Sequence, residues 1–193
     1  MSNAPVKGSG APDAPQQAKA RPAKVPEDCR EETLGVAFFD LSRISEWSGS
    51  EEDARVAGFF QQFYELAAAR IEPAGGRIVK FMGDAGLAVF ATDVAEKVIF
   101  ALCDFARDAR ALGRASGLDT YLNVNVHVGP VLAGSFGPAG DQRYDVIGKT
   151  VNVAARLGRR GVTLSAQAFR CLGPAARKRF EKNTPPVTYQ LRA

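Results

Sequence analysis

The chain has 193 residues, of which 46% are hydrophobic and 24% charged, a composition typical of globular proteins that excludes full disorder. Its net charge of +4 is too small a surplus to indicate a nucleic-acid-binding surface. No apolar run approaches the roughly 20 residues of a membrane helix and no signal-peptide stretch is present, so we expect a soluble, cytoplasmic protein without a membrane segment.

The cysteine and histidine content narrows the possible chemistry. Cys29, Cys103 and Cys171 are an odd number at wide spacing, which indicates free thiols in a reducing compartment. The single histidine, His127, excludes most zinc sites and argues against a Ser-His-Asp triad.

The first segment, residues 1–30, is rich in proline, alanine, glycine and lysine and has almost no large apolar residue. Such a segment buries too little surface to offset the entropy of ordering it. The composition therefore predicts a flexible tail or linker over residues 1–30, followed by one folded domain over residues 31–193.

The folded part opens with a strand and a helix. Residues 34–39 are a short apolar run that favours a buried strand. Residues 50–53 (Ser-Glu-Glu-Asp) predict a capping box at the start of a helix. Apolar residues then recur at helical spacing as far as Ile71, and residues 73–76 (Pro-Ala-Gly-Gly) end that helix.

A hairpin and a second helix follow. Residues 77–82 and 87–91 are apolar runs on either side of Gly-Asp-Ala-Gly, which predicts a β-hairpin. The next helix is expected to begin at Asp93 and to end at Gly113, with one apolar face.

The last elements are a strand, its expected partner and a helix. Apolar and polar residues alternate strictly over residues 121–128, which indicates a half-buried strand. Residues 131–136 are predicted to be its hairpin partner, and a further strand, a helix near residues 149–158 and a mixed end complete the chain.

The order β-α-β-β-α-β is that of the ferredoxin-like split βαβ motif. The sequence thus predicts an α+β fold with this βαββαβ core and a C-terminal extension.

Two carboxylates converge in this topology. The first strand lies antiparallel to the third, so Asp40 at the end of strand one should lie near Asp84 in the hairpin that opens strand three. Paired carboxylates at a sheet edge favour Mg²⁺ or Mn²⁺, which prefer oxygen ligands. Taken singly, either residue is an ordinary turn or cap residue, since aspartate is a common turn former.

Three segments carry a family resemblance. They are Phe39-Asp40-Leu41, residues 80–84 (Lys-Phe-Met-Gly-Asp) and residues 144–156 (Tyr-Asp-Val-Ile-Gly-Lys-Thr-Val-Asn-Val-Ala-Ala-Arg). Together they resemble the successive signatures of class III nucleotidyl cyclases, over about residues 34–191. The resemblance implies a cyclase catalytic domain, in which the ribose 3′-hydroxyl attacks the α-phosphate of a nucleoside triphosphate and pyrophosphate leaves.

The resemblance also implies roles for the matched residues. Asp40 and Asp84 match the family's metal-binding aspartates, which hold two Mg²⁺ or Mn²⁺ ions per site, and the Leu41 carbonyl adds a ligand. Asn152 and Arg156, four residues apart on the predicted helix, match the pair that orients the ribose and stabilises charge at the α-phosphate.

Lys80 and Asp145 match the family's base-selecting pair, and their chemistry fits adenine. A lysine ammonium only donates, as adenine N1 requires, while a carboxylate only accepts, as the 6-amino group requires. Guanine has the reverse pattern, with a donor at N1 and an acceptor at its 6-oxo group, so this pair should disfavour it. The expected substrate is therefore ATP and the expected product 3′,5′-cyclic AMP, a signalling nucleotide.

The family further implies a head-to-tail homodimer with composite active sites, and a regulatory domain upstream is a possibility that the sequence leaves open.

One departure from the family pattern concerns the loop after Asp40, where the family has Gly-Phe-Thr or Gly-Phe-Ser and this chain has Arg43-Ile44-Ser45. The arginine would either alter the loop or add a phosphate contact.

Alternative functions stay open at this point. One is a guanylate cyclase, in which Lys80 and Asp145 do not dictate the base. Another is a catalytically silent cyclase-like module, although such modules normally lose a metal aspartate or the Asn/Arg pair, and this chain keeps both. Palm-type polymerases and diguanylate cyclases share the fold, but the Gly-Gly-Asp/Glu-Glu-Phe turn of the diguanylate cyclases is missing here.

Overall fold

The computed structural model describes residues 25–158 and 161–192. The predicted tail therefore lies, as far as residue 24, outside the described residues. The strands are β1 (Arg30–Leu41), β2 (Gly76–Met82), β3 (Ala85–Ala91), β4 (Leu122–Phe136), β5 (Arg143–Ile147), β6 (Val162–Ser165), β7 (Phe180–Asn183) and β8 (Thr188–Leu191). The helices are α1 (Ile44–Ser48), α2 (Asp53–Ile71), α3 (Ala95–Ala115), α4 (Lys149–Arg156), α5 (Ala166–Arg170) and α6 (Pro174–Arg177), with 3₁₀ turns at Glu72–Ala74 and Thr92–Val94.

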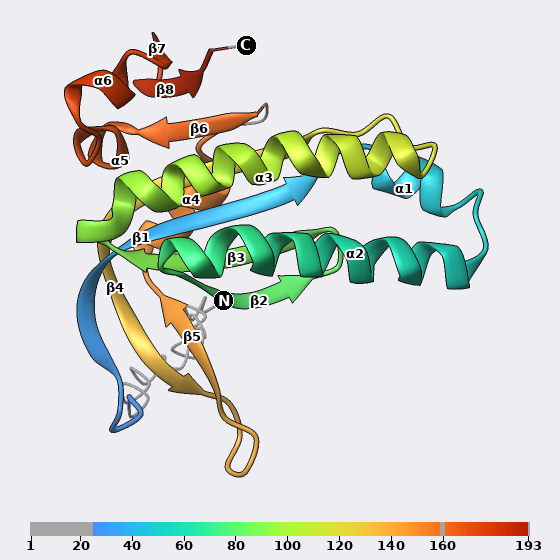
Figure 1. Cartoon of the computed structure of the whole chain (residues 1–193). Coiled ribbons are helices and arrows are strands. Elements are labelled where there is room, and N and C mark those ends of the chain that lie inside the picture. Colours follow the sequence, from blue (N-terminus) through green and yellow to red (C-terminus); the bar gives the residue numbers. More distant parts are fainter. Residues whose placement is uncertain (1–24, 159–160, 193) are drawn as a thin grey trace, which may run out of the picture.

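The strands form one sheet in the order β2-β3-β1-β4-β6-β8-β7, and β5 pairs with β4 outside this path (Figure 1). β1 is central and runs antiparallel to both β3 and β4. The helices α2 and α3 connect the strands of the core in the order predicted for a split βαβ motif. The α+β fold class with a C-terminal extension is therefore confirmed.

Strand β1 has apolar side chains on both faces of the sheet, and each face packs against other elements. Ala37, Phe39 and Leu41 belong to the core shared with α2 and α3, which lie along one face (Figure 1). Val36 on the opposite face packs in a second cluster with Ala154 of α4. Since side chains alternate along a strand, Asp40 lies on this second face, toward α4 and β5.

The predicted hairpin between residues 121–128 and 131–136 is wrong. β4 is continuous from Leu122 to Phe136, and the partner of its second half is β5. Gly129-Pro130 does not turn the chain because β1 is long enough to pair along both halves of β4, from Arg30 to Leu41. The helix expected near residues 149–158 is present as α4.

The predicted capping box is also wrong. The N-cap of α2 is Glu52, whose side chain makes no capping hydrogen bond, and the Ser50 hydroxyl instead donates to the carbonyl of Trp47 at 2.9 Å. Ser50 is held there by the short helix α1, which the sequence patterns did not predict. Within the described part of the chain, no helix has both the length and the apolar character that crossing a membrane requires.

Candidate functional site

The backbone brings Asp40 and Asp84 together at one end of the sheet. The Cα atom of Asp40 is paired with that of Ala85 across β1 and β3, and Asp84 immediately precedes Ala85. The amide of Leu41 donates to the carbonyl of Asp84 at 3.0 Å. The antiparallel register of β1 and β3 thus produces the convergence that the predicted topology required.

The electrostatics of this pair favour a bound cation. Partial burial raises the pKa of the Asp84 carboxyl, the nearby charge of Asp40 raises it further, and the hydrogen bond from the Asp84 amide opposes both. A divalent cation between two such carboxylates would remove this penalty. In the described part of the chain no group of three or more His, Cys, Asp or Glu residues lies together, so substrate oxygens would have to complete the coordination.

Asn123 lies next to Asp40 and Asp84. The sequence analysis did not assign it to the site. Its Cα atom is paired with that of Asp40, and its Nδ2 donates to Asp40 Oδ2 at 3.1 Å. Its buried Oδ1 has no hydrogen-bond partner among the described residues. Asn123 and Asn125 line a hollow of about 390 Å³ together with Asp40. The polar side of the alternating strand at residues 121–128 was the signal that pointed to both asparagines.

Tyr64 supports the β2–β3 hairpin and was also missed. Its hydroxyl donates to the carbonyl of Gly83 at 2.9 Å, and its ring stacks on Phe81 at 4.1 Å between centroids. Tyr64 lies within the predicted helix, and the sequence analysis gave it no role. The contact fixes the hairpin turn that carries Asp84.

Lys80 and Asp145, separated by 65 positions in the sequence, form an ion pair. Lys80 Nζ lies 2.5 Å from Asp145 Oδ2, and the two side chains are 42% and 25% exposed. A second contact joins the same strands, because the Arg77 guanidinium lies 3.6 Å from the centroid of the Tyr144 ring. β5 therefore reaches across to β2 and places a donor beside an acceptor at the surface.

Asn152 and Arg156 lie on the exposed side of α4. The opposite side of the helix is anchored by the buried Ala154 and by Thr150, whose hydroxyl donates to the carbonyl of Pro130 at 2.6 Å. Among the residues that the structure describes, neither Asn152 nor Arg156 has a hydrogen-bond or ion-pair partner. Their donors are thus available to a ligand, and within the described residues they form no hydrogen bond or ion pair with Asp40 or Asp84.

The loop after Asp40 shows the effect of Arg43. This residue adopts a left-handed conformation with φ of 62°, which glycine adopts without steric cost. Its Nη1 pairs with Asp119 Oδ2 at 2.8 Å. The backbone groups of Ser42 bond to the Tyr121 carbonyl at 3.0 Å and to the Thr120 hydroxyl at 2.6 Å. The loop therefore has at Arg43 the backbone conformation that glycine would adopt, and the charge of Arg43 is paired with Asp119.

The sequence matches one protein family over most of its length. Residues 27–185 match the family described as Adenylate and Guanylate cyclase catalytic domain. Adenylate cyclase 1 of Rhizobium meliloti (strain 1021) is 31% identical over an alignment of 130 residues that covers 62% of this chain and 19% of that protein. An uncharacterized protein of Mycobacterium tuberculosis (strain ATCC 25618 / H37Rv) is 29% identical over 126 residues, 63% of this chain and 23% of that one. The chain thus spans about a fifth of the length of these curated relatives.

Solved structures share the fold. The guanylyl cyclase Cya2 superposes with a TM-score of 0.74 at 19% identity, over 85% of this chain and 93% of that chain. The adenylyl cyclase CyaB from P. aeruginosa superposes with a TM-score of 0.75 at 19% identity, over 86% of this chain and 96% of that chain. At this identity the likeness establishes the fold and does not distinguish ATP from GTP as substrate.

Proposed function

The chain belongs to the family of adenylate and guanylate cyclase catalytic domains, and from this premise we propose that it converts ATP to 3′,5′-cyclic AMP and pyrophosphate. The observation that carries the choice of ATP is the contact between Lys80 and Asp145. A donor and an acceptor held side by side match adenine N1 and the adenine 6-amino group. Guanine would set a donor against Lys80 and an acceptor against Asp145.

Asp40 and Asp84 fit the role of metal ligands. Both are partly buried carboxylates, the pKa of Asp84 is raised, and the orphaned Oδ1 of Asn123 is a further oxygen close by. We propose that they hold Mg²⁺ or Mn²⁺, with the Leu41 carbonyl as an additional ligand. When bound, these ions would lower the pKa of the ribose 3′-hydroxyl and stabilise the charge on the departing pyrophosphate.

Asn152 and Arg156 are proposed to hold the ribose and the α-phosphate. An arginine stays charged and offers donors in a fixed plane, which suits an oxygen that gains negative charge as the reaction proceeds. Their spacing of four residues directs both side chains to the same side of α4. Because within the described residues they form no hydrogen bond or ion pair with Asp40, we propose that the partner chain of a homodimer brings the two halves of the site together.

Exposed apolar side chains beside α4 support such a dimer. Ile147 is 51% exposed and Val153 is 40% exposed, and both border one shallow hollow next to Thr150. Grouped apolar side chains at a surface are typical of interaction sites. We propose that a second copy of the chain covers them and brings its own Asp40 close to Arg156.

The proposal is tested by incubating the chain with ATP and with GTP, each with Mg²⁺ and with Mn²⁺, and measuring cyclic products by chromatography. Each mismatched base contact costs about 1–3 kcal/mol, so we expect cyclic AMP to exceed cyclic GMP at least about tenfold. The double variant Lys80→Glu/Asp145→Cys should lose this preference. Equal or faster use of GTP by the unmodified chain would refute the choice of ATP, and the absence of any cyclic product would indicate a silent module.

A further inference from the structure

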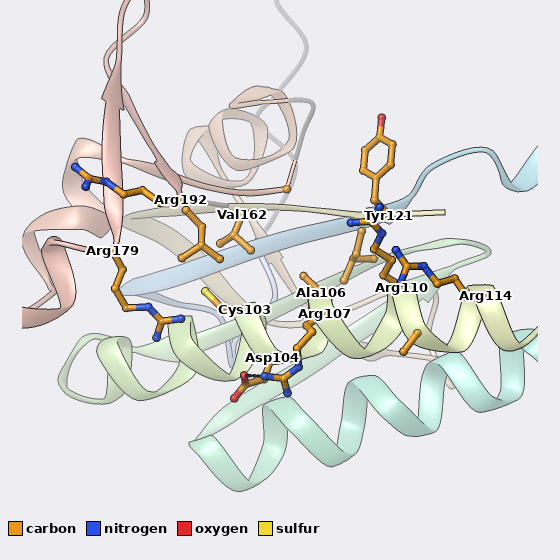
Figure 2. Close-up of a pocket in the computed structure, with 14 residues that line it drawn as sticks. Cys103, Asp104, Ala106, Arg107, Arg110, Arg114, Tyr121, Val162, Arg179 and Arg192 are labelled. Atoms are coloured by element: carbon orange, nitrogen blue, oxygen red, sulfur yellow. Dashed lines mark hydrogen bonds and ion pairs between the residues drawn. The ribbon is translucent and has the colours of Figure 1, made fainter. Parts of the chain in front are cut away.

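A second cavity lies between α3 and the C-terminal strands, and it includes none of the residues assigned to catalysis (Figure 2). Its volume is about 680 Å³. The floor is apolar and is formed by Cys103, Ala106, Leu122, Val162 and Leu191. The rim carries five arginines, Arg107, Arg110, Arg114, Arg179 and Arg192, and one acidic residue, Asp104.

The arginines of α3 are aligned by the geometry of the helix. Arg107, Arg110 and Arg114 follow one another at spacings of three and four residues, so they share one side of α3. Arg107 is neutralised by ion pairs with Asp104 and Asp108. Arg110 and Arg114, in contrast, have no hydrogen-bond or ion-pair partner within residues 25–158 and 161–192.

A third cation approaches the cavity from the other wall. Arg179 extends toward α3, and its guanidinium lies 4.7 Å from the centroid of the Phe100 ring (Figure 2). The carbonyl of Arg179 accepts a hydrogen bond from the amide of Arg192 at 2.9 Å, which fixes this wall to the end of β8. The cavity therefore has an excess of positive charge over an apolar floor, since Leu122 and Val162 are 1% and 2% exposed.

We propose that this cavity binds a small organic anion, with its apolar or aromatic body on the floor and its phosphate or carboxylate group between Arg110 and Arg114. The volume falls within the range of about 300–1,000 Å³ that small-molecule sites occupy. Arginine is suited to such groups because its planar donors match their oxygens in pairs. An arginine-rich helix that is merely solvated would need neither the concave shape nor the buried apolar floor.

The cavity adjoins the catalytic end of the sheet, so a test must separate the two sites. Tyr121 borders both the cavity and the hollow that contains Asp40. Arg156 is the free cation of the catalytic site that would attract a phosphate, and it does not line the cavity. Loss of binding on substitution of Arg156 would therefore place a bound anion in the catalytic site.

The experiment titrates the full chain, without metal or nucleotide, with fluorescent 1-naphthyl phosphate, and follows the anisotropy of the probe. Inorganic phosphate and 1-naphthol serve as competitors that carry only the charge or only the aromatic body. We expect each competitor to bind at least about tenfold more weakly than the probe, because each makes only part of the contacts. A competitor that binds as tightly as the probe would overturn the proposal, as would absence of probe binding.

Variants locate the bound probe. Arg110→Gln/Arg114→Gln should weaken binding at least about tenfold, and Arg110→Lys/Arg114→Lys, which keeps the charge, should weaken it less. Lys178→Gln, next to Arg179 but outside the lining, and Arg156→Ala should both leave the affinity within about twofold. Unchanged binding in the glutamine pair, equal loss in both pairs, or loss in either control would overturn the proposal. Because this readout needs no turnover, it is independent of whether the chain cyclises ATP.

Discussion

At the scale of single residues, the proposed chemistry depends on charges that the chain leaves unbalanced. Asp40 accepts a hydrogen bond from Asn123, and within the described ranges neither Asp40 nor Asp84 forms an ion pair. Asp84 is partly buried as well, which raises its pKa. Two neighbouring ionised carboxylates repel each other, and this repulsion is unfavourable when no cation is present. A bound metal ion would remove the repulsion.

Substitution of either aspartate tests this interpretation. Asp40→Ala or Asp84→Ala removes a ligand, so we expect cyclic nucleotide formation to fall about 100-fold or more, since the metal supplies several kcal/mol of charge stabilisation. The exposed Asp93, in the 3₁₀ turn between β3 and α3 and at the opposite end of β3 from the hairpin turn, is a matched control, and Asp93→Ala should keep full activity. Mn²⁺ should also raise the thermal unfolding midpoint of the unmodified chain and of Asp93→Ala, but not that of Asp84→Ala. Near-normal cyclisation by a folded Asp84→Ala variant would contradict the metal assignment.

His127 makes a separate prediction about pH. Its Nδ1 lies 2.9 Å from the hydroxyl oxygen of Ser165. That oxygen already accepts a hydrogen bond from the amide of Ala168, so the hydroxyl hydrogen is free to be donated to Nδ1 of a neutral imidazole. Burial lowers the pKa of His127 below its usual value of 6.5. As the pH falls through that value, the unfolded chain takes up a proton that the folded chain does not, so stability decreases toward acid pH.

This dependence is measured as the midpoint of urea unfolding between about pH 7.5 and pH 5.5, in the unmodified chain and in His127→Gln. We expect the unmodified chain to lose more stability over this interval than the variant, which has no imidazole to titrate. Identical slopes in the two proteins would show that His127 keeps an ordinary pKa when folded.

At the scale of elements, the register of the central strands depends on glycines that lie opposite aromatic rings. Gly86 of β3 is paired with Phe39 of β1, and Gly35 of β1 is paired with Phe90 of β3. A Cβ atom at Gly86 would overlap the Phe39 ring, and one at Gly35 would overlap the Phe90 ring. Each ring therefore packs over the glycine across from it and fixes the alignment that brings Asp40 beside Asp84.

Gly86→Ala should reduce the free energy of unfolding by about 1–3 kcal/mol, because it overpacks a fully buried ring. Gly58 of α2 is the matched control, since a Cβ atom there would meet nothing within 4 Å. Gly58→Ala should raise stability by about 0.5–1 kcal/mol, because alanine suits a helix interior better than glycine. Denaturant unfolding of both variants measures the difference, and a neutral Gly86→Ala would contradict the role given to the ring.

The same elements show which features the sequence could predict. The apolar run of β1 and the turn residues of the β2–β3 hairpin determine the split βαβ order, and the approach of Asp40 to Asp84 follows from that order. The continuity of β4 through Gly129-Pro130 was not predictable from local residues, because it depends on β1 pairing along its whole length. The same holds for α1, whose Trp47 packs on Phe59 of α2, and for the left-handed Arg43, which pairs with Asp119.

The approach of Lys80 to Asp145 was not visible in local patterns either. It requires β5, which stays paired with β4, to approach β2, an arrangement that only the tertiary structure contains. The resemblance to the cyclase family grouped the two residues before any geometry was known. Local patterns therefore account for the order of the core elements, whereas the pairing of β4 with β5 and the approach of Lys80 to Asp145 depend on long-range packing.

At the scale of the whole molecule, the proposed site residues of one chain fall into two separate groups. Asp40 and Asp84 lie at one end of β1 and β3, whereas Asn152 and Arg156 are exposed on α4 and bond to none of the described residues. The exposed Ile147 and Val153 beside α4 supply apolar surface that a second chain would bury. A symmetric pair of chains would complete two sites, each with carboxylates from one protomer and donors from the other.

The central claim is that ATP is cyclised at sites shared between two chains, and mixing two inactive variants tests it most directly. Asp40→Ala and Arg156→Ala are purified separately, each shown to be folded and inactive, and then combined under conditions in which subunits exchange. A heterodimer has one intact site of two and forms half of the population, so cyclic AMP formation should return to about a quarter of the unmodified rate. A mixture that exchanges subunits, as shown with labelled chains, and still makes no cyclic AMP would contradict the account.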